Sequence, residues 1–528
     1  MFKNLLLTTV IVFMLSACGG DNSTVLPSNT LPVSTPSAPS TPAPSTPAAT
    51  TPTPSARSQE LSRFVFLSSV NRQLAEDVQL QINSDTITGR SPTNVAVNEL
   101  IATFTVANAR VYVGDIEQES GVTANDFSMP VAYRIAGDDG SERDVTVDLT
   151  RFTGLPIIYA NTQGNSEIVS KDEYIDGTIR VEGGRSFPSL EMMDMEIRGR
   201  GNSTWFGPPK KPYQMKLAEK EEFLGMPEDK KWLFLAEYSD KTMLRNRMAF
   251  ELGYVSSLAW TPDSEFAEVF LNGQYNGTYL ITQKVEEDGD RVDLGDDGFL
   301  LEIDQPERLS ADDVFFTTDE YLINIKEPEL TRGDSQYQYI THYVNEFEDV
   351  LFSANFADPT TGYAAYINID SFIDWFLISE ITKNVDSQWW SSIYFHVLPG
   401  QKINMGPLWD FDLSFGNVDY ADSQYAEGWW VQQNTWINRL LDDPVFAERV
   451  KTRFRFFRDQ EAQFIAKIDA YADYLKYAQA ANDQKWQTLG EYVWPNPVVF
   501  DTHAEEVAHL KSWFIQRMNW LNNAIPTL

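Results

Sequence analysis

The chain has 528 residues, of which 42% are hydrophobic and 13% aromatic, so it can bury several cores and is not a wholly disordered polymer. Its formal net charge is −35. A chain this acidic is repelled by nucleic acids and by anionic membrane surfaces, which argues against DNA or RNA as a partner. We interpret the acidity as a source of solubility, with an acidic calcium-binding surface as the alternative.

The first residues have the pattern of a secretory leader. Lys3 precedes an apolar run, and Leu15-Ser16-Ala17-Cys18 is similar to the lipobox of bacterial lipoproteins. The similarity implies a signal peptide over 1–17, cleavage before Cys18 and lipidation of this single cysteine. An ordinary cleaved signal and an uncleaved anchor remain alternatives, although the run is short for a membrane span.

This leader predicts a protein of the bacterial cell envelope that meets the membrane only through its lipid. Gly19 follows the cysteine, where an aspartate would favour retention at the inner membrane, so we expect the outer membrane if the bacterium is Gram-negative. Residues 18–57 are almost entirely Ser, Thr, Pro, Ala, Gly and Asn. Such a composition buries no core and is typical of a disordered, extended tether.

Residues 58–150 contain short runs of strand-forming residues, among them "FVFLSSV", "LIATFTV", "ARVYVG" and "RDVTVDL". Several alternate with a period of two, and their spacing predicts an all-β sandwich. The segment is similar to the Ig-like modules of bacterial surface proteins. It has no histidine, no cysteine and no catalytic cluster, so we interpret it as a spacer or binding module.

From about residue 155 the pattern is mixed α+β. Met193, Met195 and Ile197 alternate with charged residues, the chain turns after Gly201-Asn202, and "KKPYQMKL" is again extended, which predicts a hairpin. Asn272-Gly273 between apolar runs predicts a second hairpin, and "DGFLLEID" a further strand.

One helix is predicted in "YSDKTMLRNRMAFELG", with Ser239 or Asp240 as its N-cap and Gly253 at its end. Arg245 and Asn246 in this segment are interpreted as part of a core network. Further helices are predicted in "YQYITHYVNEFEDVLF" and "IDSFIDWFLISEITKN", and residues 432–528 predict a helical C-terminal layer.

Two carboxylates interrupt the apolar run "GPLWDFDLSFGN", and a buried carboxylate is costly unless it is paired or binds a metal. "SSIYFHV" and "INMGPLWDFDLSFG" predict a hairpin. If residues 409–412 are a strand, Asp410 and Asp412 share one face and can approach one cation. The alternative is that they are structural and cap a turn.

Eight motifs, "RGRGNSTW", "KKPYQMKL", "YSDKTMLRN", "VFLNGQYNGTYLIT", "RVDL", "GFLLEID", "ITKNVDS" and "GPLWDFDLSFGN", together resemble the CotH kinase family over 155–528. The resemblance implies a divergent protein-kinase-like domain that binds ATP or another nucleotide with Mg²⁺, or with Mn²⁺ in its place. It implies phosphate transfer to Ser or Thr of an exported protein acceptor.

The resemblance also implies roles for single residues. Asp410 is the main metal ligand, Asp412 a second ligand or a structural cap, and Asn384 assists. Asp386 in "NVDS" orients the acceptor hydroxyl. The cations expected at the nucleotide phosphates are Lys216, then Lys211, with Arg198 and Arg200 behind them.

Three positions depart from the pattern expected for this assignment. "RGRGNST" has Thr204 where a third glycine would complete a phosphate loop, and its alternative is a hairpin turn with cross-strand ion pairs to Asp194 or Glu196. Ser391 occupies the position at which a kinase catalytic loop has asparagine, and Gln283 a position at which the family often has glutamate.

Three functions therefore stay open. The first is an envelope-anchored phosphotransferase. The second is an adhesion or binding lipoprotein that keeps the fold without catalysis. The third is a hydrolase or transferase acting on envelope glycans with Asp386 and Asp410 as paired carboxylates. Mg²⁺-dependent nucleotide binding separates the first from the others.

Overall fold

The computed structural model describes residues 61–93, 95–184 and 186–528. The predicted signal peptide, Cys18 and the tether lie outside the described residues, so they stay predictions. In the described part of the chain, no helix has the length and apolar character needed to cross a membrane.

The part from Leu61 to Phe152 is all-β, as its sequence pattern predicts, while its assignment as an Ig-like module stays a prediction. Phe64, Phe66 and Phe104 from one sheet share a core with Tyr133 and Ile135 from another. The strands are β1 (Leu61–Phe66), β2 (Val78–Gln79), β3 (Gln81–Asn83), β4 (Thr86–Pro92), β5 (Leu100–Ile101), β6 (Thr103–Val106), β7 (Ala109–Val113), β8 (Ile116–Glu117), β9 (Ala124–Asn125), β10 (Val131–Gly137) and β11 (Glu142–Phe152).

A closed seven-stranded barrel follows, in the order β12-β13-β14-β15-β16-β18-β17. Its interior is filled by large side chains such as Met215, Trp232 and Tyr279. Two of the predicted hairpins are confirmed here: β14 pairs with β15, and β17 with β18 around Asn272-Gly273. The strands are β12 (Ile157–Thr162), β13 (Ile175–Glu182), β14 (Leu190–Gly199), β15 (Tyr213–Phe223), β16 (Met226–Leu235), β17 (Ser264–Leu271) and β18 (Gln274–Gln283).

One carboxylate of the barrel makes the stability of the protein depend on pH. Glu268 on β17 is only 1% exposed, and burial raises its pKa from 4.5 to about 7. Because the folded pKa is the higher one, the free energy of unfolding falls by up to about 3 kcal/mol as pH rises from 4.5 to 7. We expect the free energy of unfolding of Glu268→Gln, relative to that of the wild type, to rise by about this amount between pH 4.5 and 8. Urea unfolding at both pH values measures it. An equal difference at both pH values would contradict this.

The helix predicted from Ser239 or Asp240 begins later, so that boundary was wrong. The helix is α2 (Arg245–Tyr254), and residues 240–243 form a turn before it, in which Met243 has a φ of 59°. The carboxylate of Asp240 accepts hydrogen bonds from the backbone N–H groups of Thr242, at 3.1 Å, and Arg245, at 2.7 Å, and it pairs with the Arg245 guanidinium. Asp240 and Arg245 therefore form the predicted core network.

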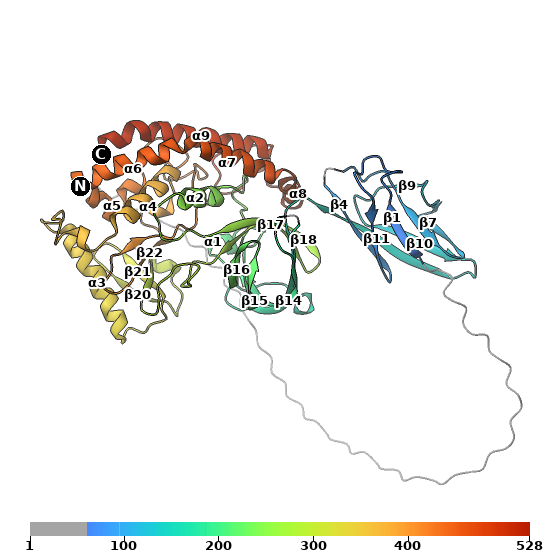
Figure 1. Ribbon diagram of the computed structural model, residues 1–528, viewed down its shortest axis with the longest axis horizontal. Helices are drawn as coiled ribbons and strands as arrows, with labels where there is room; N and C mark the ends of the chain where they lie inside the picture. The colour runs from blue at the N-terminus through green and yellow to red at the C-terminus, as the bar shows by residue number, and fades with distance from the viewer. Residues whose placement is uncertain (1–60, 94, 185) are drawn as a thin grey trace, which may run out of the picture. The chain divides into compact units, whose positions relative to one another are not determined.

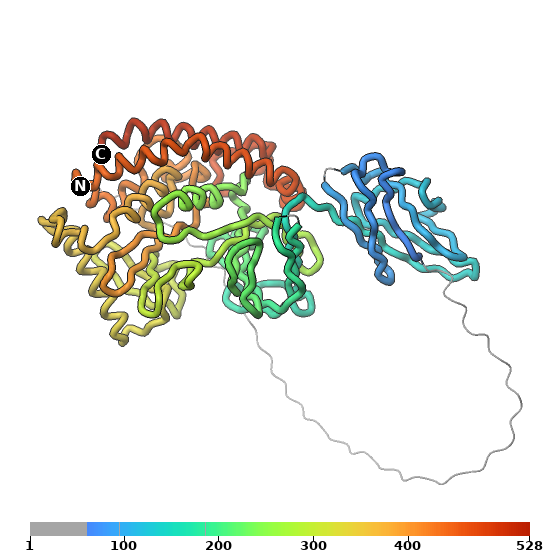
Figure 2. Tube along the Cα trace, in the orientation of Figure 1, coloured from blue at the N-terminus to red at the C-terminus, as the bar shows by residue number. Residues whose placement is uncertain are grey.

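A five-stranded sheet in the order β20-β21-β19-β22-β23 shares one core with the C-terminal helices. Helix α9 packs against α4 and α7 (Figure 1), and the orange and red segments in Figure 2 trace this predicted helical layer. The elements are β19 (Phe299–Asp304), β20 (Val314–Thr317), β21 (Leu322–Glu327), α3 (Ser335–Phe352), α4 (Ile369–Thr382), β22 (Ile393–Val397), β23 (Asn404–Met405), α5 (Thr435–Leu441), α6 (Pro444–Asp459), α7 (Glu461–Tyr474), α8 (Lys476–Trp486) and α9 (His503–Ala524).

Candidate active site

A cavity of about 940 Å³ lies between the barrel, the five-stranded sheet and the loop that follows β23. Its lining comes from the turn after β14, from β19 and β21, from the segment between α4 and β22, and from the loop after β23. Five of the residues assigned to the site from the sequence line it together, namely Arg198, Arg200, Asp386, Asp410 and Asp412.

The strand expected at 409–412 does not form, so the shared strand face of the two aspartates was wrong. β23 ends at Met405, because Gly406 has a φ of 101° and Pro407 has no N–H to donate to a ladder. Asp410 itself has a φ of 63°, in the left-handed region that aspartate tolerates better than most residues. Even so, Asp410 and Asp412 both line the cavity.

The loop is held from α2 and from Ser392, the residue before β22. The side-chain oxygen of Asn246 accepts the backbone N–H of Phe411 at 2.7 Å, and Arg245 donates to the carbonyl of Ser414 at 3.2 Å. The hydroxyl of Ser392 donates to Asp410 Oδ2 at 3.3 Å. The predicted core network thus positions the loop that carries the two aspartates.

The carboxylates of the cavity repel one another. Burial, and then the charge of Asp410, raise the pKa of Asp386 to about 7. Burial, and then the charges of Asp410 and Asp386, hold the pKa of Asp412 well above its ordinary range. A cation between them would relieve this repulsion.

Asp386 begins the 3-10 helix η4 (Asp386–Gln388), which follows α4. Asn384, expected to assist at the metal, is not part of the cavity lining. Its side-chain nitrogen donates to Ser387 Oγ at 3.0 Å, and its buried Oδ1 has no hydrogen-bond partner among the described residues. Ser391 does line the cavity, with a buried hydroxyl that also lacks a partner in the described part of the chain.

Of the four cations predicted at the phosphates, the structure brings Arg198 and Arg200 to the cavity. The guanidinium of Arg200 lies over the ring of Trp409, 5.5 Å from its centroid. Burial lowers the pKa of Arg200, while the charge of Asp410 opposes that shift. Arg198 lies over the ring of Tyr174 at 4.6 Å.

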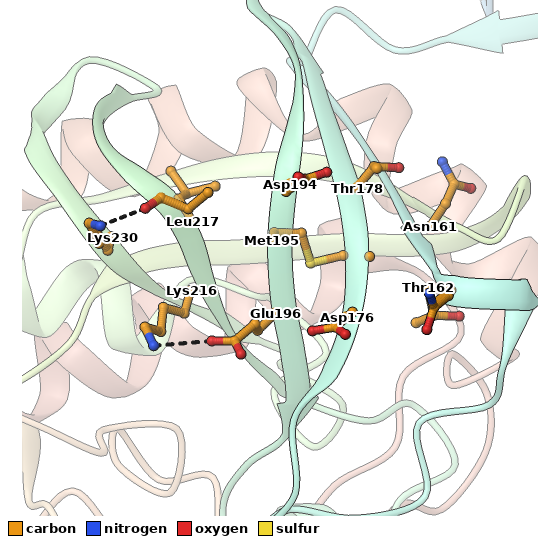
Figure 3. Close-up of a pocket in the computed structure, with 13 residues that line it drawn as sticks. Asn161, Thr162, Asp176, Thr178, Asp194, Met195, Glu196, Lys216, Leu217 and Lys230 are labelled. Carbon is orange, nitrogen blue, oxygen red and sulfur yellow. Dashed lines mark hydrogen bonds and ion pairs between the residues drawn. The ribbon is translucent and has the colours of Figure 1, made fainter.

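The two predicted lysines, Lys216 and Lys211, lie elsewhere. Lys216 lines a separate pocket on the barrel, where its Nζ pairs with Glu196 at 3.1 Å (Figure 3). Lys216 is two residues beyond Gln214, which lines the main cavity, so it lies about 7 Å further along β15. Lys211 donates to the carbonyl of Trp205 at 2.6 Å. A cross-strand ion pair to Glu196, as the alternative interpretation of this hairpin expects, is present and comes from Lys216.

Sequence analysis missed several charged residues of the cavity, among them Glu302, Asp304 and Lys326. Glu302 pairs with Lys326 at 3.3 Å and accepts the backbone N–H of Ser392 at 3.1 Å. Burial raises the pKa of Glu302 to about 7. The sequence does carry a signal for Glu302 and Asp304, since two carboxylates interrupt the apolar strand "FLLEID" as they do in "WDFD". Arg308 and Lys171 also line the cavity.

A family model described as "CotH kinase protein" matches residues 197–521. The chain belongs to the CotH kinase family. The matched range contains every residue named above as a lining residue of the cavity, apart from Lys171. Family membership favours kinase-like activity for the chain.

A curated relative is similar to part of this CotH-family chain. Inner spore coat protein H of Bacillus subtilis (strain 168) is 24% identical over 263 residues, which are 46% of this chain and 65% of the relative. The chain thus spans just under two thirds of the length of that relative.

Two solved structures are similar to parts of this chain. One, from Bacteroides fragilis NCTC 9343 and described as a secreted protein, is 18% identical, covers 18% of this chain and 95% of that chain, and has a TM-score of 0.14. The other, from Bacteroides thetaiotaomicron VPI-5482 and described as a glycoside hydrolase, is 15% identical, covers 55% of this chain and 89% of that chain, and has a TM-score of 0.17. Neither likeness carries an argument about fold or function.

Proposed function

We propose that the cavity binds ATP or another nucleotide together with Mg²⁺ and transfers phosphate to Ser or Thr of exported proteins. This proposal is supported by one observation: Asp386, Asp410, Asp412 and Arg200 line the same cavity of a CotH-family domain. Phosphoryl transfer asks a protein for positioned carboxylates and cations in a site sheltered from water. Radiolabel transfer from ATP to a protein acceptor tests it.

The donor set fits Mg²⁺, or Mn²⁺ in its place, because both prefer carboxylate oxygens. Among the described residues, no group of three or more His, Cys, Asp or Glu side chains is arranged to hold a metal alone. This suits Mg²⁺, which is often bound by one or two carboxylates with water and phosphate completing its shell. Asp410 would hold it, with Asp412 as the lesser ligand, and it would neutralise charge on the phosphates.

The other roles fall to residues of the chain itself. Arg200, Arg308 and Lys326 line the cavity and would bind the phosphate oxygens. Asp386 would orient the acceptor hydroxyl and take its proton. The bond between the γ-phosphorus and the oxygen bridging to the β-phosphate breaks, the bond to the acceptor oxygen forms, and the nucleoside diphosphate leaves.

A non-catalytic binding protein is the second candidate. Ser391 lines the cavity at the position where a kinase has a metal-binding asparagine, and serine is a poorer ligand. A protein that binds nucleotide but transfers no phosphate would fit this candidate. In both cases we propose that the protein is anchored to the cell envelope through Cys18.

A matched pair of variants tests which cations bind the phosphates. We expect Arg200→Met to weaken ATP binding about tenfold or more, because a hydrogen bond to a charged group contributes about 1.5–3 kcal/mol. We expect Lys216→Met to leave the affinity within about twofold, because Lys216 lies in the other pocket and its exposed pair with Glu196 contributes little. Calorimetric titration measures both. The reverse ranking would restore Lys216 as the phosphate ligand.

A further inference from the structure

One oxygen of the Asp410 carboxylate is held by a serine. The hydroxyl of Ser392, the residue before β22, donates to Asp410 Oδ2 at 3.3 Å, and both residues line the cavity. Among the described residues, the other carboxylate oxygen, Oδ1, has no hydrogen-bond partner. The protein therefore fixes one oxygen of the proposed metal ligand and leaves the other available to a cation.

Ser392 and Asp410 both have a backbone conformation that is uncommon outside glycine. The angle φ is 59° at Ser392 and 63° at Asp410. The left-handed region costs about 1–2 kcal/mol for a residue with a Cβ, and serine is not among the residues enriched there. Glycine would avoid this cost but has no hydroxyl. A strained serine whose hydroxyl reaches a site carboxylate is typical of backbone held in place for function.

Ser392 is held in turn by Glu302 on β19. The ladder between β19 and β22 ends at the pair of Ile303 and Ile393, so the N–H of Ser392 lies beyond it. Glu302 Oε1 accepts this N–H at 3.1 Å. Glu302 is only 6% exposed, and its Oε2 pairs with Lys326 on β21 at 3.3 Å. A buried side chain that is bonded at both oxygens has little freedom to turn, so it fixes the position of Ser392.

This support differs from the contacts that α2 makes with the same loop. The side chains from α2 bond the backbone at Phe411 and at Ser414. They hold the course of the loop but leave the side chain of Asp410 free to rotate. The hydroxyl of Ser392 bonds the carboxylate of Asp410 itself. It is thus placed to set the direction of the proposed metal ligand, in addition to any effect on the fold.

We propose that Ser392 and Glu302 are positioning residues for the metal, which fix the carboxylate of Asp410 so that its Oδ1 stays available to Mg²⁺. This inference rests on the proposed function, in which Asp410 holds the cation. Groups that orient a metal ligand contribute about 10–100-fold to metal affinity. Neither residue needs to touch the cation or the nucleotide for this effect.

Two titrations of the full-length protein test the inference. One follows the binding of Mn²⁺ through the EPR signal of the free ion, and the other is calorimetry with Mg²⁺ and a non-hydrolysable ATP analogue. We expect Ser392→Ala and Ser392→Gly to weaken both by about tenfold, because each lacks the hydroxyl. Ser392→Gly should keep the unfolding midpoint of the wild type, since glycine adopts a φ of 59° without steric cost. A role of the hydroxyl in the fold alone would lower that midpoint and leave the affinity for Mn²⁺ unchanged.

Two variants of Glu302 test the second positioning residue. Glu302→Gln keeps an oxygen that can accept the N–H of Ser392, so we expect an affinity for Mn²⁺ within about threefold of the wild type. Glu302→Ala has no such oxygen, and we expect about tenfold weaker binding. The matched control is Ser310→Ala. Ser310 also lines the cavity, but among the described residues its hydroxyl bonds none of the site carboxylates, so we expect wild-type binding.

The outcomes separate this inference from the proposed function. If the wild type binds Mn²⁺ and the nucleotide, and both Ser392 variants bind them equally well, the inference is overturned and the proposed function stands. Equal losses of affinity in Glu302→Gln and Glu302→Ala would overturn the role of Glu302. A wild-type protein that binds neither Mn²⁺ nor the nucleotide would overturn the proposed function itself.

Discussion

Asp410→Asn is expected to abolish Mg²⁺-dependent nucleotide binding. The substitution keeps the size of the side chain and removes the charge that would hold the cation in the cavity. Loss of groups that merely orient a metal ligand costs about 10–100-fold in affinity, so loss of the ligand itself should cost at least about 100-fold. Calorimetric titration with a non-hydrolysable ATP analogue measures it.

Asp412→Asn is the matched comparison for Asp410→Asn, because both residues line the same cavity from one loop. We expect it to weaken binding less, since Asp412 is the lesser ligand in the proposal. A folded Asp410→Asn protein that binds nucleotide like the wild type would show that the metal assignment is wrong. Circular dichroism and the unfolding midpoint establish whether each variant is folded.

Asp386→Asn is expected to spare nucleotide binding and to remove transfer. An asparagine at this position can neither take the proton of the acceptor hydroxyl nor hold it by charge, and a positioned general base contributes about 10²–10⁴-fold. We therefore expect transfer to fall by about that factor, measured with radiolabelled ATP and a saturating acceptor.

Nucleotide binding and phosphate transfer, measured for both Asp386→Asn and Asp410→Asn, distinguish the roles of these two aspartates. If Asp386→Asn lost binding as completely as Asp410→Asn, both side chains would be metal ligands. If Asp386→Asn kept the wild-type transfer rate, another group would accept the proton. Glu302, which lines the same cavity, would then be the next residue to test.

The periodic part of the fold could be predicted from the sequence. The hairpin at Asn272-Gly273, the hairpin of β14 and β15, and the long helices α3 and α4 follow from patterns within one segment. The start of α2 could not, because a turn over residues 240–243, tied to Asp240, takes the place of the expected first turn of helix.

The site was only partly predictable because it depends on contacts between distant segments. The two carboxylates of "WDFD" stand out in an apolar run, yet the backbone of this segment is bonded to Asn246, 165 positions away from Phe411. Lys216 fits a phosphate-binding pattern, but its position along β15 places it beside Glu196. Lys326 has no local signal, and only the pairing of β19 with β21 brings it to Glu302.

Titration of the wild-type protein with ATP, with and without Mg²⁺, tests the central claim most directly. The carboxylates of the cavity repel one another and the phosphates, so nucleotide should bind only when the cation is present. The account predicts saturable, one-site binding with Mg²⁺ and none after chelation with EDTA. No binding of ATP or any other nucleotide with Mg²⁺ or Mn²⁺ would contradict it and favour the adhesion lipoprotein.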